Sequence, residues 1–251
     1  MYTINRITLT FFLLQLYTYA FTQVNAPSTH VIVKLIPVFN NQKLILNDKD
    51  YLTKQNDTIR ITLFKMYLGN FRFISDEKSN SNMPAEYFLI DSEDTATFTL
   101  HFNTILSSRV NQLELLIGVD SLTNVSGALG GDLDPIKGMY WAWNTGYVSA
   151  KMEGNFKRNN GTSKKFEFHI GGYQKPFESS RKILIPFPET TIKPNEVLYM
   201  EFYLDLAEWF IGKTSIQLAQ VNSVVHPCNI SYQLADNYSK MIKYKNSKII
   251  K

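Results

Sequence analysis

Histidines are the residues of this chain whose chemistry is easiest to connect with a metal. In a protein that leaves the cytoplasm, neutral imidazole is a natural ligand for copper or zinc. For any single histidine, a surface or core position without a ligand role is the ordinary alternative. The four candidates are His30, His101, His169 and His226, of which His101, between two apolar residues of a predicted strand, is the least distinctive.

His169 has the most informative neighbours. In residues 166–170 the three apolar side chains share one face of a strand, so His169 points to the opposite face. The turn signal at residues 159–161 pairs this strand with residues 147–154 in a hairpin. Because the buried pattern sets the register, matching the two apolar faces places His169 on the face of Tyr147.

Two tryptophans precede that hairpin in the aromatic segment 138–154, GMYWAWNTGYVSAKMEG. Trp141 and Trp143 share the face of His169 if the chain passes Gly146 without a bulge. A bulge at Gly146 reverses their direction, and glycine is where a bulge is expected. The two indoles therefore either line a site beside His169 or fill the core of a sandwich, and the sequence leaves both arrangements open.

Acidic residues provide a second candidate metal site. Asp120, Asp132 and Asp134 flank a glycine-rich loop, and oxygen ligands on such a loop would suit Ca²⁺. Their spacing is not that of an EF-hand, and most aspartates in such loops bond to their own backbone in turns. Calcium is therefore less favoured than a metal that binds through histidine.

The standard catalytic patterns are absent from the chain. It contains no Walker loop, no GxSxG elbow, no HExxH and no CxxC pair. A hydrolase is the weakest hypothesis because no nucleophile–base pair is visible, and we expect a binding protein rather than an enzyme. Cys228 is the only cysteine, so no internal disulfide forms, and we expect it to be a small packed residue. Its position two residues after His226 leaves a metal-ligand role open.

The formal net charge of +4 is spread along the chain, without a concentrated basic face. Nucleic-acid binders usually have such a face, so we expect no nucleic-acid partner. The lysines of residues 240–251 form a short basic tail, which we expect to be a solvated or frayed terminus.

Period-2 alternation of apolar and polar residues predicts the elements that would position these side chains. Two strands are expected in the central segment, one turn of helix at residues 207–211, and a C-terminal helix at residues 231–244 capped by Ser231. Residues 76–82 and 124–135 are predicted loops. The other predicted strands are residues 30–39, 43–46, 58–73, 87–91, 95–102, 112–119, 165–170, 182–186 and 196–206. The pattern indicates an all-β fold, an antiparallel β-sandwich with a short C-terminal helix, in a single domain over residues 27–245.

The N-terminus has the features of a secretory signal over residues 1–20. Arg6 provides the positive charge, residues 7–16 form the apolar run, and residues 18–20 offer a small-residue cleavage site. No segment reaches the roughly 18 apolar residues of a membrane-spanning helix. We therefore expect an exported protein, periplasmic or at the cell surface, with no membrane span.

Motifs spread over nearly the whole mature chain are similar to those of one known family. They are residues 118–121 (GVDS), 134–135 (DP), 138–147 (GMYWAWNTGY), 153–154 (EG) and 168–172 (FHIGG). In these motifs the chain resembles the MbnP-like family of exported proteins. That family is named for a periplasmic protein associated with methanobactin, a copper-scavenging product.

The resemblance implies a β-rich MbnP-like domain and a copper site. By analogy with surface copper proteins, it implies histidine ligands and a tryptophan oxidised to kynurenine by a partner oxidase. His169 is then the first ligand candidate and His226 the second, and Trp141 or Trp143 is the tryptophan that is oxidised. The function expected is an exported, non-enzymatic copper-binding or copper-handling protein. The alternative is a cell-surface or periplasmic binding or structural module without a metal.

Overall fold

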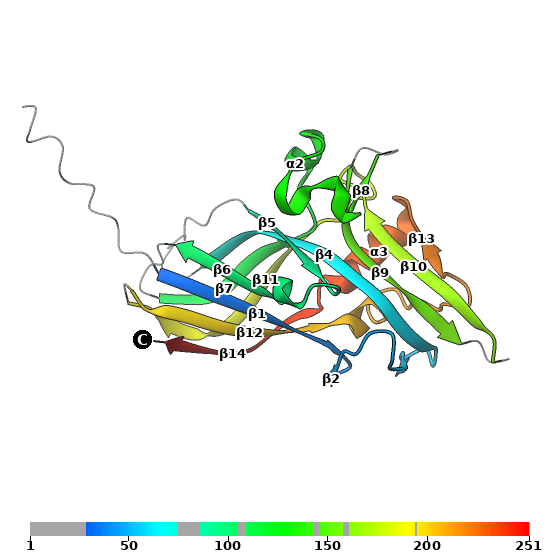
Figure 1. Cartoon of the computed structure of the whole chain (residues 1–251), viewed down its shortest axis with the longest axis horizontal. Helices are drawn as coiled ribbons and strands as arrows, with labels where there is room; N and C mark the ends of the chain where they lie inside the picture. The colour runs from blue at the N-terminus through cyan, green and yellow to red at the C-terminus, as the bar shows by residue number, and fades with distance from the viewer. Residues whose placement is uncertain are drawn as a thin grey trace, which may run out of the picture.

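Two β-sheets pack face to face and enclose the main hydrophobic core (Figure 1). The structure is a computed structural model that describes residues 29–74, 86–104, 109–142, 146–157, 161–193 and 195–250. The predicted secretory signal at residues 1–20 and the predicted loop at residues 76–82 lie outside the described residues.

Alternation of side chains explains the first strand. β1 (Thr29–Phe39) buries every second side chain over most of its length and turns the others toward solvent. Asn40 and Asn41 then adopt positive φ angles of 49° and 62°, a conformation that asparagine tolerates better than most residues. This turn reverses the chain into β2 (Gln42–Lys43), which pairs antiparallel with the end of β1.

The smaller sheet has five strands in the order β14 (Ile242–Ile250), β12 (Val197–Asp205), β1 and β2. The fifth strand, β6 (Thr99–Thr104), also pairs with β1. β1 and β12 run parallel, whereas the pairs of β1 with β2 and β6, and of β12 with β14, are antiparallel. The first and last described strands therefore lie in the same sheet.

Within the described residues the larger sheet has nine strands, and their pairs are antiparallel except that of β10 with β13. Its main path is β11 (Arg181–Thr191), β7 (Arg109–Ile117), β4 (Thr58–Ile74), β9 (Gly146–Lys157), β10 (Ser163–Gly171) and β13 (Ser223–Val224). Three short strands complete it: β3 (Tyr51–Leu52) and β5 (Tyr87–Asp91) on β4, and β8 (Tyr140–Trp141) on β9.

Helices in the described part of the chain are short. The α-helices are α2 (Ser121–Val125) and α3 (Asn229–Tyr238). The 3₁₀ helices are η1 (Thr95–Phe98), η2 (Gly131–Leu133), η3 (Pro135–Lys137) and η4 (Leu206–Phe210). None of these helices has the length and apolarity needed to cross a membrane.

Aromatic side chains fill the space between the sheets. Trp209 in η4 is fully buried and stacks on Phe168 of β10 with ring centroids 6.5 Å apart. Phe64 of β4 meets the same indole edge-on at 6.3 Å. Offset and edge-to-face geometries of this kind stabilise aromatic pairs beyond their buried area.

A second hydrophobic cluster covers the outer face of the larger sheet. Residues of β4, β5 and β9 pack there against the segment that runs from Val119 to Trp141. In Figure 1 this segment, with α2, lies on the side of β4 and β9 away from β1 and β12. The cluster consists of Tyr67, Leu89, Val119, Leu133, Met139, Trp141, Tyr147 and Val148.

The all-β sandwich predicted from the sequence is confirmed, but its sheets are not wholly antiparallel as expected, because β1 pairs in parallel with β12 and β10 with β13. Other details also differ. Residues 95–98 form η1, because the Asp94 side chain accepts a hydrogen bond from the N–H of Ala96 and caps a turn there. The helix predicted at residues 231–244 with Ser231 as its cap instead spans Asn229–Tyr238, and its N-cap is Cys228. The basic tail is not a frayed terminus: it forms β14, which pairs with β12, and Lys245 forms an ion pair of 2.9 Å with Glu201.

Candidate functional site

The hairpin of β9 and β10 determines the direction of His169. The strands pair with Phe168 opposite Met152 and His169 opposite Lys151. Phe168 and Met152 belong to the core between the sheets. Because side chains alternate along a strand, His169 lies on the outer face, as the apolar pattern predicted.

Glu153 is the direct partner of His169 on that face. Nε2 of His169 and Oε1 of Glu153 are 2.7 Å apart, and their side chains are 20% and 35% exposed. Glu153 lies opposite Glu167 in the ladder, so it is the diagonal neighbour of His169. In a neutral imidazole whose Nε2–H donates to the carboxylate, Nδ1 carries the lone pair that can bind a metal.

Lys151 lies directly opposite His169 in the hairpin, on the same strand as Glu153. Nζ of Lys151 donates to the backbone carbonyl of Gly138 at 2.6 Å. Burial lowers the pKa of Lys151, and the nearby Glu153 carboxylate opposes this effect. Lys65 follows on β4, opposite Lys151, and forms an ion pair of 2.8 Å with Asp91. The outer face around His169 is thus a row of charged side chains on neighbouring strands.

The chain reverses between Trp141 and Gly146. Trp141 pairs with Gly146 and Tyr140 with Tyr147, so β8 folds back on the start of β9. The central segment therefore supplies two strands, as predicted. The two arrangements considered from the sequence, a strand that continues straight past Gly146 and a strand with a bulge at Gly146, both differ from this antiparallel pairing. The bulge lies further along, at Ser149, because Ile170 pairs with Ala150 whereas Gly171 pairs with Val148.

This reversal places Trp141 against the strand of His169. Trp141 is 8% exposed and belongs to the outer cluster together with Tyr147 and Tyr67. A Cβ atom at Gly171 would lie only 2.6 Å from Cζ3 of the indole, so the absence of a side chain permits the contact. Gly171 is two residues after His169 in β10. Trp143, the other predicted tryptophan, lies outside the described residues.

His226 lies in the bend between β13 and α3 and is exposed. β13 runs parallel to β10, and the chain after β13 brings Pro227 against Gly172. A Cβ atom added to Gly172 would lie 3.1 Å from Cβ of Pro227. The segment of His226 and the indole of Trp141 therefore both approach the end of β10 that follows His169. Cys228 is half-buried at the N-terminus of α3, where its N–H donates to Oγ of Ser231 at 2.8 Å.

The three aspartates proposed for calcium are bonded to the protein itself. Asp120 caps α2 and also accepts a hydrogen bond from the hydroxyl of Tyr87. Asp132 forms an ion pair of 2.5 Å with Lys137, and Asp134 caps η3. Across the described ranges, no three His, Cys, Asp or Glu side chains gather into a group that could hold a metal ion. The turn-forming role accounts for Asp120 and Asp134, whereas Asp132 pairs with Lys137 and accepts a hydrogen bond from the N–H of Leu89.

His30 and His101 lie away from this region, on the smaller sheet, with Nε2 of His30 3.3 Å from Nδ1 of His101.

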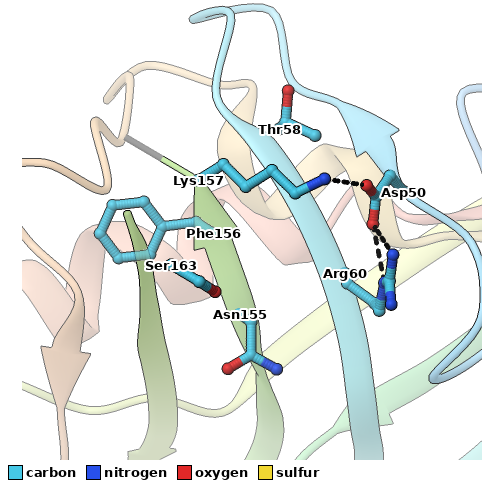
Figure 2. A pocket seen from close by; sticks show the side chains of 7 residues that line it. All are labelled: Asp50, Thr58, Arg60, Asn155, Phe156, Lys157 and Ser163. Carbon is cyan, nitrogen blue, oxygen red and sulfur yellow. Dashed lines mark hydrogen bonds and ion pairs between the residues drawn. The ribbon is translucent and has the colours of Figure 1, made fainter. Parts of the chain in front are cut away.

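A polar pocket lies beside the end of β9 that is remote from Trp141. Figure 2 shows Arg60 and Lys157 converging on Asp50 there, with ion pairs of 2.7 and 2.6 Å. These cations, Lys157 first, lower the pKa of Asp50. The pocket contains none of the predicted site residues.

Two residues of the site were not singled out as site residues from the sequence. Glu153 could have been found, because the turn signal at residues 159–161 already implies the register that places it beside His169. Gly171 could not have been assigned its role, because its contact with Trp141 depends on the antiparallel pairing of β8 with β9.

Comparison with known proteins supplies independent information. A family model described as MbnP matches residues 28–229. A solved structure of MbnP from Methylosinus trichosporium superposes with a TM-score of 0.51 at 14% identity, covering 76% of this chain and 83% of that chain. At this identity the likeness concerns the fold. Among curated proteins, none matches this chain.

Proposed function

Since its residues 28–229 match the MbnP family model, the chain belongs to the MbnP family, and from this premise we propose that it is an exported protein that binds or handles copper. We further propose that it acts as a binding protein and not as an enzyme, in the periplasm or at the cell surface. The metal would bind on the outer face of the larger sheet, where β10 meets β8 and β13.

One observation carries this proposal: the indole of Trp141 packs against Gly171, two residues beyond His169 on the same strand. His169 and Trp141, 28 positions apart in the sequence, thus lie near the same end of β10. The Glu153 carboxylate supports the proposal further, because it engages Nε2 of His169 at 2.7 Å and leaves Nδ1 for a metal.

These residues fit copper by the chemistry of their donors. Imidazole nitrogen is a preferred ligand of copper, and His226, exposed in the bend before Pro227, would provide the second one. When bound, copper would supply a centre that can change its oxidation state. Trp141 or Trp143 would be the tryptophan that a partner oxidase converts to kynurenine. The burial of Trp141 in the aromatic cluster would hold the modified ring in place.

The test is copper retention by the mature protein isolated from its natural host. Equilibrium dialysis should leave one tightly held copper, and His169→Ala should lose it. Lys165→Ala is the matched control, since Lys165 is an exposed residue of the same strand, paired with Asn155 away from Trp141. Intact mass should reveal the small gain that accompanies conversion of tryptophan to kynurenine. Absence of copper in the wild-type protein, or equal retention by His169→Ala, would contradict the proposal.

The alternative function, a binding module without a metal, is favoured by one observation. The segment that covers the outer cluster exposes large apolar side chains, with Leu122 75% and Ile136 88% accessible. Exposed apolar side chains on one segment are typical of surfaces that meet a partner. A protein that retains no copper but loses a native partner when Leu122 and Ile136 are changed to serine would support this function instead.

A further inference from the structure

A pair of histidines faces solvent on the smaller sheet, on β1 and β6. In the antiparallel ladder His30 lies opposite Asn103 and His101 opposite Ile32, so the two histidines are diagonal neighbours. Their ring centroids are 5.5 Å apart, and Nε2 of His30 is 3.3 Å from Nδ1 of His101. Residues 71 positions apart in the sequence thus direct ring nitrogens at each other.

Asn103 determines which nitrogen of His30 carries the proton. Its Oδ1 lies 2.9 Å from Nδ1 of His30, and a side-chain amide oxygen can only accept a hydrogen bond. In the neutral ring the proton is therefore on Nδ1, and the lone pair is on Nε2, directed at His101. A metal-binding histidine commonly donates its second ring N–H to an oxygen in this way.

The spacing of the two nitrogens matches that of ligands on one metal ion. Metal–nitrogen bonds of about 2.0–2.1 Å in a tetrahedral site place neighbouring ligand nitrogens roughly 3.3–3.4 Å apart. We propose that His30 Nε2 and His101 Nδ1 form a second metal site, for a divalent ion of the zinc and copper class, with water completing the coordination. Before the metal binds, Nδ1–H of His101 donates to Nε2 of His30. Binding then requires only that this proton moves to Nε2 of His101.

The backbone beneath the pair is well held. The neighbours Val31, Leu100 and Phe102 point into the core and are 0%, 3% and 4% exposed. Both imidazoles are accessible from solvent, so an ion can reach them without a rearrangement of the fold. A bridging ion would also tie β6 more firmly to the sheet, because among the described strands β6 pairs with β1 alone.

Titration of the full mature protein with Zn²⁺ tests this site separately from the copper site proposed above. We expect wild-type protein to bind one more Zn²⁺ than His101→Ala, measured by isothermal titration calorimetry. The double variant His169→Ala, His226→Ala should keep that Zn²⁺, because both residues lie outside the smaller sheet. At free Zn²⁺ ten times the Kd of this site, its occupancy should raise the ratio of folded to unfolded protein about 11-fold, so Zn²⁺ should raise Tm more in wild type than in His101→Ala.

Three results would overturn the proposal. They are no Zn²⁺ binding by wild-type protein, equal binding by His101→Ala, and loss of the ion in the double variant but not in His101→Ala. If His101→Ala folds poorly, His101→Gln removes the imidazole and keeps a polar side chain at this exposed position. Circular dichroism of each variant confirms that the fold is retained.

Discussion

Replacing Gly171 with alanine tests the contact that joins Trp141 to β10. The new methyl carbon would lie 2.6 Å from Cζ3 and 2.9 Å from Cη2 of the indole, and 2.9 Å from the backbone oxygen of Tyr147. The indole is held in the outer cluster, and the carbonyl belongs to the backbone of β9, so neither retreats easily. Overpacking of this kind costs about 1–3 kcal/mol. Alanine restricts the unfolded chain more than glycine does, which offsets about 0.4–1 kcal/mol of that cost.

We therefore expect Gly171→Ala to lower the free energy of unfolding by about 1–2 kcal/mol, measured by urea denaturation. Gly130→Ala is the control, because a Cβ atom at Gly130 meets nothing within 4 Å and its φ is −95°. Its effect should stay within about 0.5 kcal/mol.

A double-mutant cycle identifies the clashing partner. Trp141→Phe removes the indole carbons Cζ3 and Cη2. Alanine at position 171 should therefore cost less in that background, with a coupling energy of about 0.5–2 kcal/mol. If Gly171→Ala is as stable as Gly130→Ala, or if the two changes are additive, Trp141 does not pack on Gly171 and the reasoning about the site fails.

Three further outcomes follow from contacts near the site and in the core. Glu153→Ala should weaken copper binding about 10–100-fold by releasing His169 from its hydrogen bond; unchanged affinity in a chelator competition would count against this. Burial raises the pKa values of Tyr67 and Tyr238 above that of unfolded tyrosine, about 10. Above that pH the unfolded chain loses protons that the folded protein keeps, so stability that is complete below pH 10 declines as pH rises; urea midpoints that stay level up to about pH 11 would refute this. Asp205→Ala should cost about 1–3 kcal/mol, because the buried carboxylate accepts hydrogen bonds of 2.9 and 3.2 Å from two backbone N–H groups; a urea midpoint equal to that of wild type would show that these bonds contribute little.

Local pattern was sufficient for the hairpin that carries His169. The alternation in residues 166–170 and the turn signal at residues 159–161 predicted both the pairing with β9 and the outward direction of the histidine. These contacts join residues close in sequence, and side-chain alternation along a strand follows from backbone geometry alone.

Local pattern was insufficient where a strand pairs with distant residues. The tail from Ile242 to Ile250 has several lysines, yet it forms an edge strand because its apolar side chains continue the inner face of β12 and its lysines meet acidic and aromatic partners. The parallel pairing of β1 with β12 joins segments that are far apart in the sequence, with His30 opposite Val197, and nothing in either strand alone specifies that partner.

The sequence by itself determined the all-β class, most strand positions and the face of His169. Each of these depends on side-chain alternation or on the conformational preference of a few consecutive residues. Only the tertiary structure decided that Trp141 lies against Gly171 and that His30 meets His101. Those contacts join residues 30 and 71 positions apart, and they require the register of strands that the hydrophobic core brings together.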